Sequence, residues 1–336
     1  MRAVVFEGNG KVDVLERPDP RIERPDDVVV RVAANGLCGS DLRAFATPPE
    51  MVYDKGVIVG HEFSGTVVDV GDETELEPGT HVVVHPNIWC QKCWYCRSGY
   101  TNLCERFVHI GSMRDGGAAE FCVVPERMVY RIPHEMPFDL AALAEPLACV
   151  LNGTRQAAVH PGESVLVLGG GPIGLLYVML FKAAGASPLI VSEPAAQRAA
   201  WARELGADIV VNPTASDVEA AVRELTGGRG ADVAIDSVGG LLSSAVASVR
   251  KRGRVFIFGL NERADAVLRP ADLVYKELAV SGVYIARGTF PLAVDLLTEN
   301  ALGFDRLLTH RLQLEQIDKA IELLRTGEAV KALVVP

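Results

Sequence analysis

Residues 164–193 read SVLVLGGGPIGLLYVMLFKAAGASPLIVSE, in which apolar runs alternate with glycine, proline and serine. The run SVLVL has the length of a buried strand, IGLLYVMLFKAAGA that of a helix, and PLIVSE that of a second strand. Between the first strand and the helix, Gly169, Gly171 and Gly174 follow the pattern GxGxxG. The stretch therefore predicts a strand–turn–helix–strand unit of a parallel sheet.

The glycine loop predicts a dinucleotide site. In such a loop Gly169 permits the tight turn, Gly171 lets the backbone approach a pyrophosphate, and Gly174 packs the helix on the strand. Pro172 and Ile173 begin the helix, whose free N–H groups and positive dipole end favour phosphates. The pattern alone also fits an ordinary glycine turn, but its place between a strand and a helix favours cofactor binding.

The end of the next strand bears on the choice of cofactor. Glu193 lies nineteen residues after Gly174, where a carboxylate binds the adenosine ribose hydroxyls and repels a 2′-phosphate. This position favours NAD over NADP. Arg198 keeps NADP as an alternative, and Glu193 is also the kind of carboxylate that a helix dipole favours at a helix start.

Two patterns divide the chain. From about residue 148 to residue 286, strands and helices alternate and predict a doubly wound parallel sheet. Before about residue 130, short β-rich runs predict an all-β unit, namely AVVFE, DVVVRVAA, SGTVVDV, THVVVHP and AEFCVVP. We therefore predict an α/β protein with a cofactor domain at 148–286, inserted between residues 1–147 and 287–336 of a β-rich catalytic domain.

Size and charge limit the classes of function. The chain has 336 residues, 49% of them hydrophobic, which supports two domains with their own cores. A net charge of −10 disfavours nucleic acid and anionic membranes as partners. The amino terminus lacks the pattern of a signal peptide. Glycines and a proline break the longest apolar run, so we expect no membrane span.

Four of the seven cysteines lie close together in the run CQKCWYCRSGYTNLC at residues 90–104. Four thiolates at these spacings can surround one zinc ion tetrahedrally and leave no open position. Far upstream, Cys38 and Gly60-His61-Glu62 offer a mixed set of ligands that can leave a position for water or substrate. An odd number of cysteines with this clustering indicates metal chemistry in a reducing compartment, and hence the cytoplasm. The four clustered residues are Cys90, Cys93, Cys96 and Cys104.

The order of these motifs resembles the zinc-dependent medium-chain dehydrogenases over essentially the whole chain. Cys38-Gly39-Ser40-Asp41, the GHE triplet, the four-cysteine run and the inserted glycine loop follow one another as in that family. GHEFSGTVVDVG at 60–71 is similar to the zinc signature of the family. Glu145-Pro146-Leu147, where the alcohol dehydrogenase branch carries a cysteine, resembles the sorbitol, threonine and related polyol branch.

The resemblance implies a GroES-like catalytic domain joined to a Rossmann domain, with two zinc ions per chain, NAD, and assembly as a homodimer or homotetramer. Cys38, His61 and Glu62 would hold the catalytic zinc, and the four clustered cysteines the structural zinc. Glu145 would be either a direct ligand or the holder of the zinc-bound water. The implied reaction transfers a hydride between NAD and a secondary alcohol of a polyol, sugar or cyclitol.

The resemblance also implies a route for the substrate proton. Ser40 matches the hydroxyl of the family that accepts this proton. The family often continues the relay to a histidine five residues after the ligand cysteine, but this chain has Arg43 there. Because a guanidinium cannot accept a proton near pH 7, we expect the histidine step to be absent or replaced. A contact of Arg43 with the cofactor phosphates is a further hypothesis.

Other interpretations use some of the same motifs. A threonine- or butanediol-type zinc dehydrogenase would share both sites, and Arg114 or Arg287 could bind the carboxylate of threonine. A zinc-ribbon regulatory or interaction protein would explain residues 90–104 alone. Quinone reductases without zinc share the fold but lack both cysteine sets.

The remaining noteworthy side chains are expected to be structural. DGGAAEF at 115–121 resembles a family segment near the active site, and its glycines also fit a turn. We expect surface or hydrogen-bonded loop histidines at His85, His109 and His134. We expect buried, inert thiols at Cys122 and Cys149. The aromatic side chains expected to pack around the cysteine cluster are Trp89, Trp94 and Tyr95.

Overall fold

Six parallel strands form the sheet that carries the glycine loop, in a computed structural model that describes residues 1–336. Their order across the sheet is β12-β11-β10-β13-β14-β15, and every neighbouring pair is parallel. This is the Rossmann order 3-2-1-4-5-6, so the predicted α/β fold class is confirmed. The strands are β10 (Val165–Leu168), β11 (Leu189–Ser192), β12 (Ile209–Val211), β13 (Ala231–Asp236), β14 (Val249–Ile257) and β15 (Ala279–Gly282).

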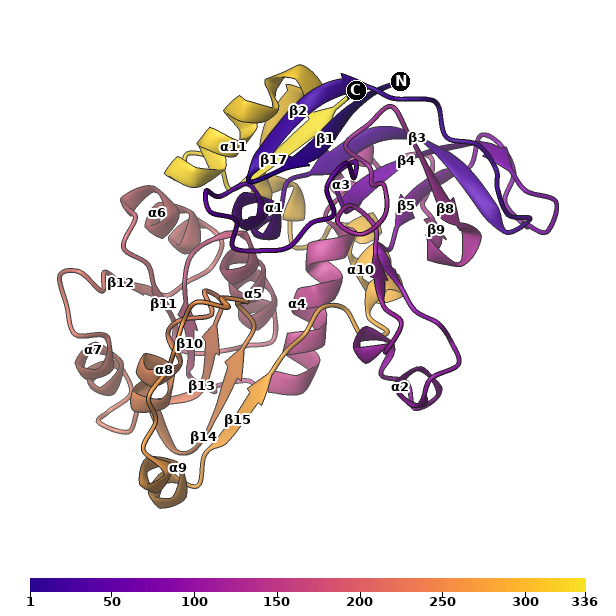
Figure 1. Cartoon of the computed structure of the whole chain (residues 1–336). Coiled ribbons are helices and arrows are strands. Elements are labelled where there is room, and N and C mark those ends of the chain that lie inside the picture. The colour runs from indigo at the N-terminus through magenta and orange to yellow at the C-terminus, as the bar shows by residue number, and fades with distance from the viewer. The chain divides into compact units, whose positions relative to one another are not determined.

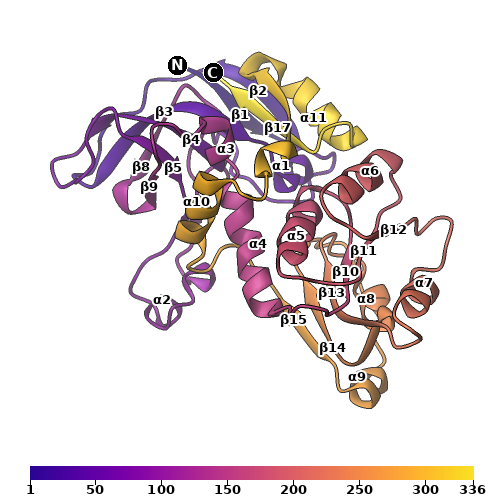
Figure 2. The same cartoon turned by 180° about the vertical axis from the view of Figure 1, so that it is seen from behind.

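Helices follow these strands as the alternating pattern predicts. Side chains alternate between the faces of a strand, so Leu166 and Leu168 join one apolar cluster with residues of α7 and α8, while Val165 and Val167 are buried on the opposite face. Figure 2 shows this sheet and its helices from behind. The helices are α5 (Pro172–Ala183), α6 (Ala196–Glu204), α7 (Val218–Leu225), α8 (Leu242–Ser248) and α9 (Pro270–Lys276).

A second sheet of seven strands is built from both ends of the chain. Its order is β16-β17-β3-β4-β5-β9, and β8 also pairs with β3. The C-terminal strand β17 runs antiparallel beside β3, and Figure 1 shows the yellow C-terminal strand among the indigo N-terminal strands. The strands are β3 (Asp27–Gly36), β4 (Glu62–Val70), β5 (His81–Val84), β8 (Phe121–Pro125), β9 (Val129–Arg131), β16 (Leu308–Gln313) and β17 (Lys331–Val335).

Shorter elements complete this part of the chain. Two strand pairs lie outside the large sheet: β1 (Arg2–Gly8) with β2 (Lys11–Glu16), and β6 (Asn87–Ile88) with β7 (Val108–His109). The helices include α1 (Gly39–Ala44), α2 (Trp94–Arg97), α3 (Phe138–Ala141), α4 (Ala144–Ala157), α10 (Phe290–Glu299) and α11 (Ile317–Thr326). The short 3-10 helices are η1 (Thr101–Leu103), η2 (Glu126–Met128), η3 (Phe304–Leu307) and η4 (Leu314–Gln316).

The chain divides into two compact units, one comprising Met1–Cys149 with Ala286–Pro336 and the other Val150–Ile285. The first holds the seven-stranded sheet and all residues expected to bind metal. The second holds the glycine loop. None of the helices has the length and apolar character needed to cross a membrane.

Candidate metal centres and dinucleotide loop

Two adjacent strands bring Cys38, His61 and Glu62 together. Gly36 at the end of β3 pairs with Glu62 at the start of β4, which places Cys38, two residues beyond Gly36, beside the GHE triplet. One ligand atom from each of the three side chains lies within 4.8 Å of the others. A Cβ at position 36 would overlap the Glu62 carboxylate, so the close approach requires glycine there. Sulfur, nitrogen and oxygen donors thus converge in a largely buried place.

Asp41 orients His61 from the first turn of α1. Its buried carboxylate lies 3.6 Å from Nδ1 of His61 and accepts hydrogen bonds from the Tyr53 hydroxyl at 2.7 Å and the Cys38 amide at 2.9 Å. Burial alone would lower the pKa of His61, but Asp41 and Cys38 raise it well above its usual value. A metal binding to this ring must therefore displace a proton. In a metal-bound histidine, the ring nitrogen that does not bind the metal usually faces a carboxylate or a carbonyl group.

Lys331 lies behind Glu62 and was not anticipated from the sequence. Its buried ammonium forms an ion pair with Oε2 of Glu62 and donates a hydrogen bond to the Leu37 carbonyl at 3.0 Å. Burial opposes the charge, yet Glu62 and Cys38 raise the pKa of Lys331. A buried charge requires such a partner, and Lys331 therefore fixes the glutamate within the cluster.

Glu145 lies in the first turn of α4 and stands apart from the group of three. It is buried, and its Oε1 accepts a hydrogen bond from the Cys149 thiol at 3.1 Å, one turn further along the helix. Burial raises the pKa of Glu145, while the charge of His61 opposes this rise. The carboxyl group is thus electrostatically coupled to the cluster but outside its set of converging ligand atoms.

Ser40 and His109 flank His61 on other sides. The Ser40 hydroxyl lies 3.5 Å from Nε2 of His61, and the ring of His109 lies 4.9 Å from the ring of His61, centroid to centroid. Nδ1 of His109 is 2.7 Å from the Ser112 hydroxyl. Burial lowers the pKa of His109 well below its usual value, and His61 adds to this. His109 is hydrogen-bonded as expected, but it lies in strand β7 rather than in a loop.

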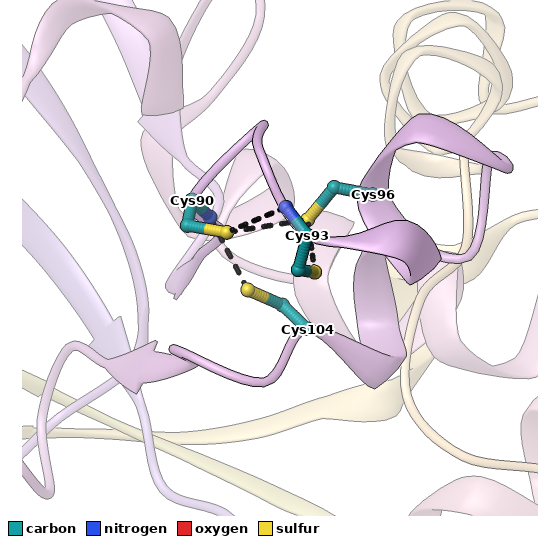
Figure 3. Close-up of side chains that lie close together, drawn as sticks. All are labelled: Cys90, Cys93, Cys96 and Cys104. Carbon is teal, nitrogen blue, oxygen red and sulfur yellow. Dashed lines mark hydrogen bonds between the residues drawn. The ribbon is translucent and has the colours of Figure 1, made fainter.

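The four clustered cysteines form the second group, with their sulfur atoms within 4.8 Å of one another. Sγ of Cys96 lies 3.4 Å from Sγ of Cys93 and 3.9 Å from Sγ of Cys90, and Figure 3 shows the four thiols directed toward one centre. Tetrahedral zinc with Zn–S bonds of about 2.3 Å requires sulfur separations of about 3.8 Å. The cluster thus fits a closed site.

Backbone amides support these thiols. The Cys93 amide donates to Sγ of Cys90 at 3.3 Å, and the Cys90 and Arg106 amides donate to Sγ of Cys104 at 3.2 and 3.3 Å. Amide donors from Lys92 and Cys93 lower the pKa of Cys90 to about 6. Because the thiolate is the form that binds metal, these amide donors favour the form of Cys90 that binds a cation.

The glycine loop joins β10 to α5 in the second unit. Gly169 has φ of 100°, and a Cβ at Gly174 would overlap the Gly169 carbonyl, so both positions require glycine. A Cβ at Gly171 would contact no protein atom, as expected where glycine serves the approach of a ligand. Gly171 is the N-cap of α5, and Pro172 and Ile173 form its first turn.

Glu193 follows β11 and holds the loop. Its carboxylate is buried and accepts hydrogen bonds from the Gly170 amide at 2.7 Å and the Ala195 amide at 2.8 Å. Arg198 is the third residue of α6. The loop and the carboxylate thus meet at the C-terminal edge of adjacent strands, where a doubly wound sheet binds its ligand.

The structure also places the other side chains named from the sequence. Cys122 and Cys149 are buried, as predicted. His85 is buried against Phe290, and its Nδ1 accepts a hydrogen bond from the Asn87 backbone amide at 3.2 Å, so it is hydrogen-bonded, as expected. Trp94 is 67% exposed, and its ring stacks on Tyr100 of the same cysteine-containing run.

The glycines at 116 and 117 do more than form a turn. A Cβ at Gly117 would overlap the ring of Phe63, and the Gly117 amide donates to the Gly60 carbonyl at 2.8 Å. Both glycines therefore allow residues 115–121 to pack directly on the segment that carries the GHE triplet.

Comparisons with known proteins agree with this geometry. Residues 24–134 match the family model of the alcohol dehydrogenase GroES-like domain, and residues 172–299 match that of the zinc-binding dehydrogenase. L-threonine 3-dehydrogenase of Pyrococcus abyssi is 34% identical over 92% of this chain and 91% of its own length. Sorbitol dehydrogenase of Bacillus subtilis is 30% identical over 100% of this chain and 97% of its own.

A solved structure agrees as well. The crystal structure of a zinc-binding dehydrogenase from Sinorhizobium meliloti 1021 bound to NADP superposes with a TM-score of 0.94 at 34% identity, covering 100% of this chain and 99% of that one. With both family models matched and relatives aligned along nearly its whole length, the chain belongs to the zinc-dependent medium-chain dehydrogenase family, whose members oxidise alcohols or reduce carbonyl groups.

Proposed function

We propose that this enzyme transfers a hydride between NAD and a secondary alcohol of a polyol, sugar or cyclitol, at a zinc ion held by Cys38, His61 and Glu62. The observation that carries the proposal is the convergence of these three donors within 4.8 Å, with His61 and Glu62 buried. Oε1 of Glu62 is buried and lacks a hydrogen-bond partner, while Oε2 forms the ion pair with Lys331. A buried carboxylate oxygen without a partner fits a cation, which would satisfy it.

The bound zinc would supply Lewis acidity, which makes the substrate hydroxyl more acidic. The residues of the chain supply the rest. Asp41 holds the His61 ring, and Lys331 limits the negative charge of Glu62. Glu145 lies close enough to couple with them electrostatically, which suits a carboxylate that orients a water or the substrate hydroxyl.

The nicotinamide cofactor would bind on the glycine loop. A Cβ at Gly171 would contact no protein atom, which supports the approach of a pyrophosphate to the backbone there. The buried carboxylate of Glu193 supports NAD over NADP. The relative from Sinorhizobium meliloti was crystallised with NADP, so both cofactors belong in any assay.

The polyol assignment is supported by the sorbitol dehydrogenase relative. A threonine dehydrogenase is equally similar, but threonine needs a cation for its carboxylate. The guanidinium of Arg287 lies 5.3 Å over the Tyr100 ring, and Arg114 donates to the Val123 carbonyl at 3.2 Å. Each contact engages only part of a guanidinium with five N–H donors, so the substrate screen below separates the two substrate classes.

We also propose a homodimer or homotetramer in the cytoplasm. None of the seven cysteines forms a disulfide bond, as expected in a reducing compartment. The decisive experiment is a screen of sorbitol, xylitol, inositol, 2,3-butanediol and threonine with NAD and NADP. Turnover of a polyol with NAD supports the proposal, and oxidation of threonine alone would overturn the assigned substrate class.

Ser40→Ala is expected to lower kcat by about 10²-fold, the lower end for a positioned proton-transfer group. The reason is that the Ser40 hydroxyl lies beside Nε2 of His61 and is only half-buried, so it can pass the substrate proton toward water. Steady-state kinetics and zinc content check this. Ser40→Thr keeps a hydroxyl and should retain most activity, while an unchanged kcat in Ser40→Ala would remove Ser40 from the catalytic residues.

Cys93→Ser is expected to remove the structural zinc and lower the melting temperature, because three thiolates and a hydroxyl bind zinc far more weakly than four thiolates. Cys122→Ser is the matched control, since Cys122 is a buried thiol outside both clusters. Metal analysis and thermal unfolding compare the two. Equal zinc content in both variants would contradict the assignment.

A further inference from the structure

The small strand pair β6·β7 carries His109, whose ring lies beside the metal ligand His61, and a second polar residue, Asn87. Asn87 of β6 is the direct partner of His109 of β7 in the antiparallel register. Directly opposed residues project their side chains from the same face of a strand pair. Ile88, the next residue of β6, packs in an apolar cluster, so Asn87 projects to the opposite side, together with His109.

His109 links this face to the metal ligands. Its ring lies 4.9 Å from the His61 ring, and its Nδ1 is engaged with the Ser112 hydroxyl at 2.7 Å. This bond fixes the ring and leaves Nε2 for another partner. The residue is partly exposed, whereas His61 is buried.

Asn87 is the unexplained feature of this face. The residue is 3% exposed, and neither its amide oxygen nor its amide nitrogen has a hydrogen-bond partner. Burying an amide without partners is costly, and buried polar groups in native proteins nearly always have one. The amide offers one acceptor and two donors, which complements a hydroxyl group that both donates and accepts.

We propose that Asn87 and His109 form a subsite that binds a second hydroxyl group of the substrate, adjacent to the carbinol that is oxidised. The site would select vicinal diols and polyols over simple secondary alcohols, because an alcohol without the second hydroxyl leaves the buried amide of Asn87 unpaired. The proposal rests on the proposed function of the metal site. It adds the reason why this chain would use polyhydroxy substrates.

The test compares 2,3-butanediol with 2-butanol, which differ by a single hydroxyl group. In the wild type, kcat/KM for the diol should exceed that for the mono-alcohol by at least about 10-fold. Asn87→Leu and His109→Phe should each lower the diol preference, the ratio of kcat/KM for 2,3-butanediol to that for 2-butanol, by about 10-fold. His134→Phe is the matched control, since that ring lies against His81, and it should change neither value.

A second measurement does not depend on turnover. Calorimetric binding of erythritol to the zinc-loaded protein should weaken in Asn87→Leu and His109→Phe but not in the control, with zinc content unchanged. If the wild type oxidises neither alcohol, the proposed function fails, and erythritol binding alone decides the subsite. Equal losses for diol and mono-alcohol, or unchanged diol preference and erythritol binding, would overturn the proposal and leave a buried water as the partner of Asn87.

Discussion

His61→Ala is expected to lower kcat for polyol oxidation by at least about 10³-fold and to reduce the zinc content from two ions per chain to one. The side chain is buried between Asp41 and Ser40 and supplies the single nitrogen donor of the cluster. Lewis-acid catalysis contributes several kcal/mol to the stabilisation of the transition state, and each 1.36 kcal/mol corresponds to about a factor of ten in rate. Kinetics and metal analysis on the same sample provide the check.

Asp41→Asn is expected to lower zinc affinity or activity less than His61→Ala does. It keeps the shape of the side chain but removes the charge behind His61, and loss of such outer partners typically costs about 10–100-fold in metal affinity or activity. His134→Ala should affect neither zinc nor turnover. Two zinc ions and near-normal kcat in His61→Ala would show that the active metal is bound elsewhere.

Glu193→Ala is expected to lower kcat/KM for NAD by about 10–100-fold and to relax discrimination against NADP. The carboxylate is the expected ribose acceptor, and a buried charge there opposes a 2′-phosphate. It also accepts the Gly170 amide, so its removal loosens the loop as well. Kinetics with both cofactors measure the change.

Glu193→Gln separates the two effects of the carboxylate. Glutamine keeps an acceptor for the Gly170 amide but removes the negative charge, so the loop should persist while NADP becomes a better cofactor. A wild-type enzyme that already prefers NADP would contradict this interpretation of Glu193.

The Rossmann unit was predictable because its elements alternate at short range. SVLVLGG, the helical run after it and PLIVSE correspond to β10, α5 and β11 within three residues at each end. The two-residue strands β6 and β7 were not predicted, because a pair this short has no periodicity of its own. Strand β14 begins at Val249, ahead of the predicted run RVFIFGL, because Ala231 of β13 already pairs with Val249, and a register shift separates this pair from Val233 and Arg254.

At the metal site, the sequence motifs anticipated which side chains would meet, but not what surrounds them. Lys331 bonds to the Leu37 carbonyl 294 residues away, and no local pattern reports such a contact. The juxtaposition of Asn87 with His109 likewise depends on strand register. The quoted motif Cys38-Gly39-Ser40-Asp41 contained a usable signal for Asp41, since a carboxylate beside ligand residues often orients a histidine.

The most direct test of the account follows zinc content and activity together during chelation of the purified enzyme. The closed four-cysteine site should hold its metal while the open site at Cys38, His61 and Glu62 releases it. The predicted result is two zinc ions per chain at full activity, with polyol oxidation lost in proportion to the first ion removed and restored when zinc is returned. Full activity with a single zinc ion per chain, or activity that persists after the labile ion has left, would contradict the account.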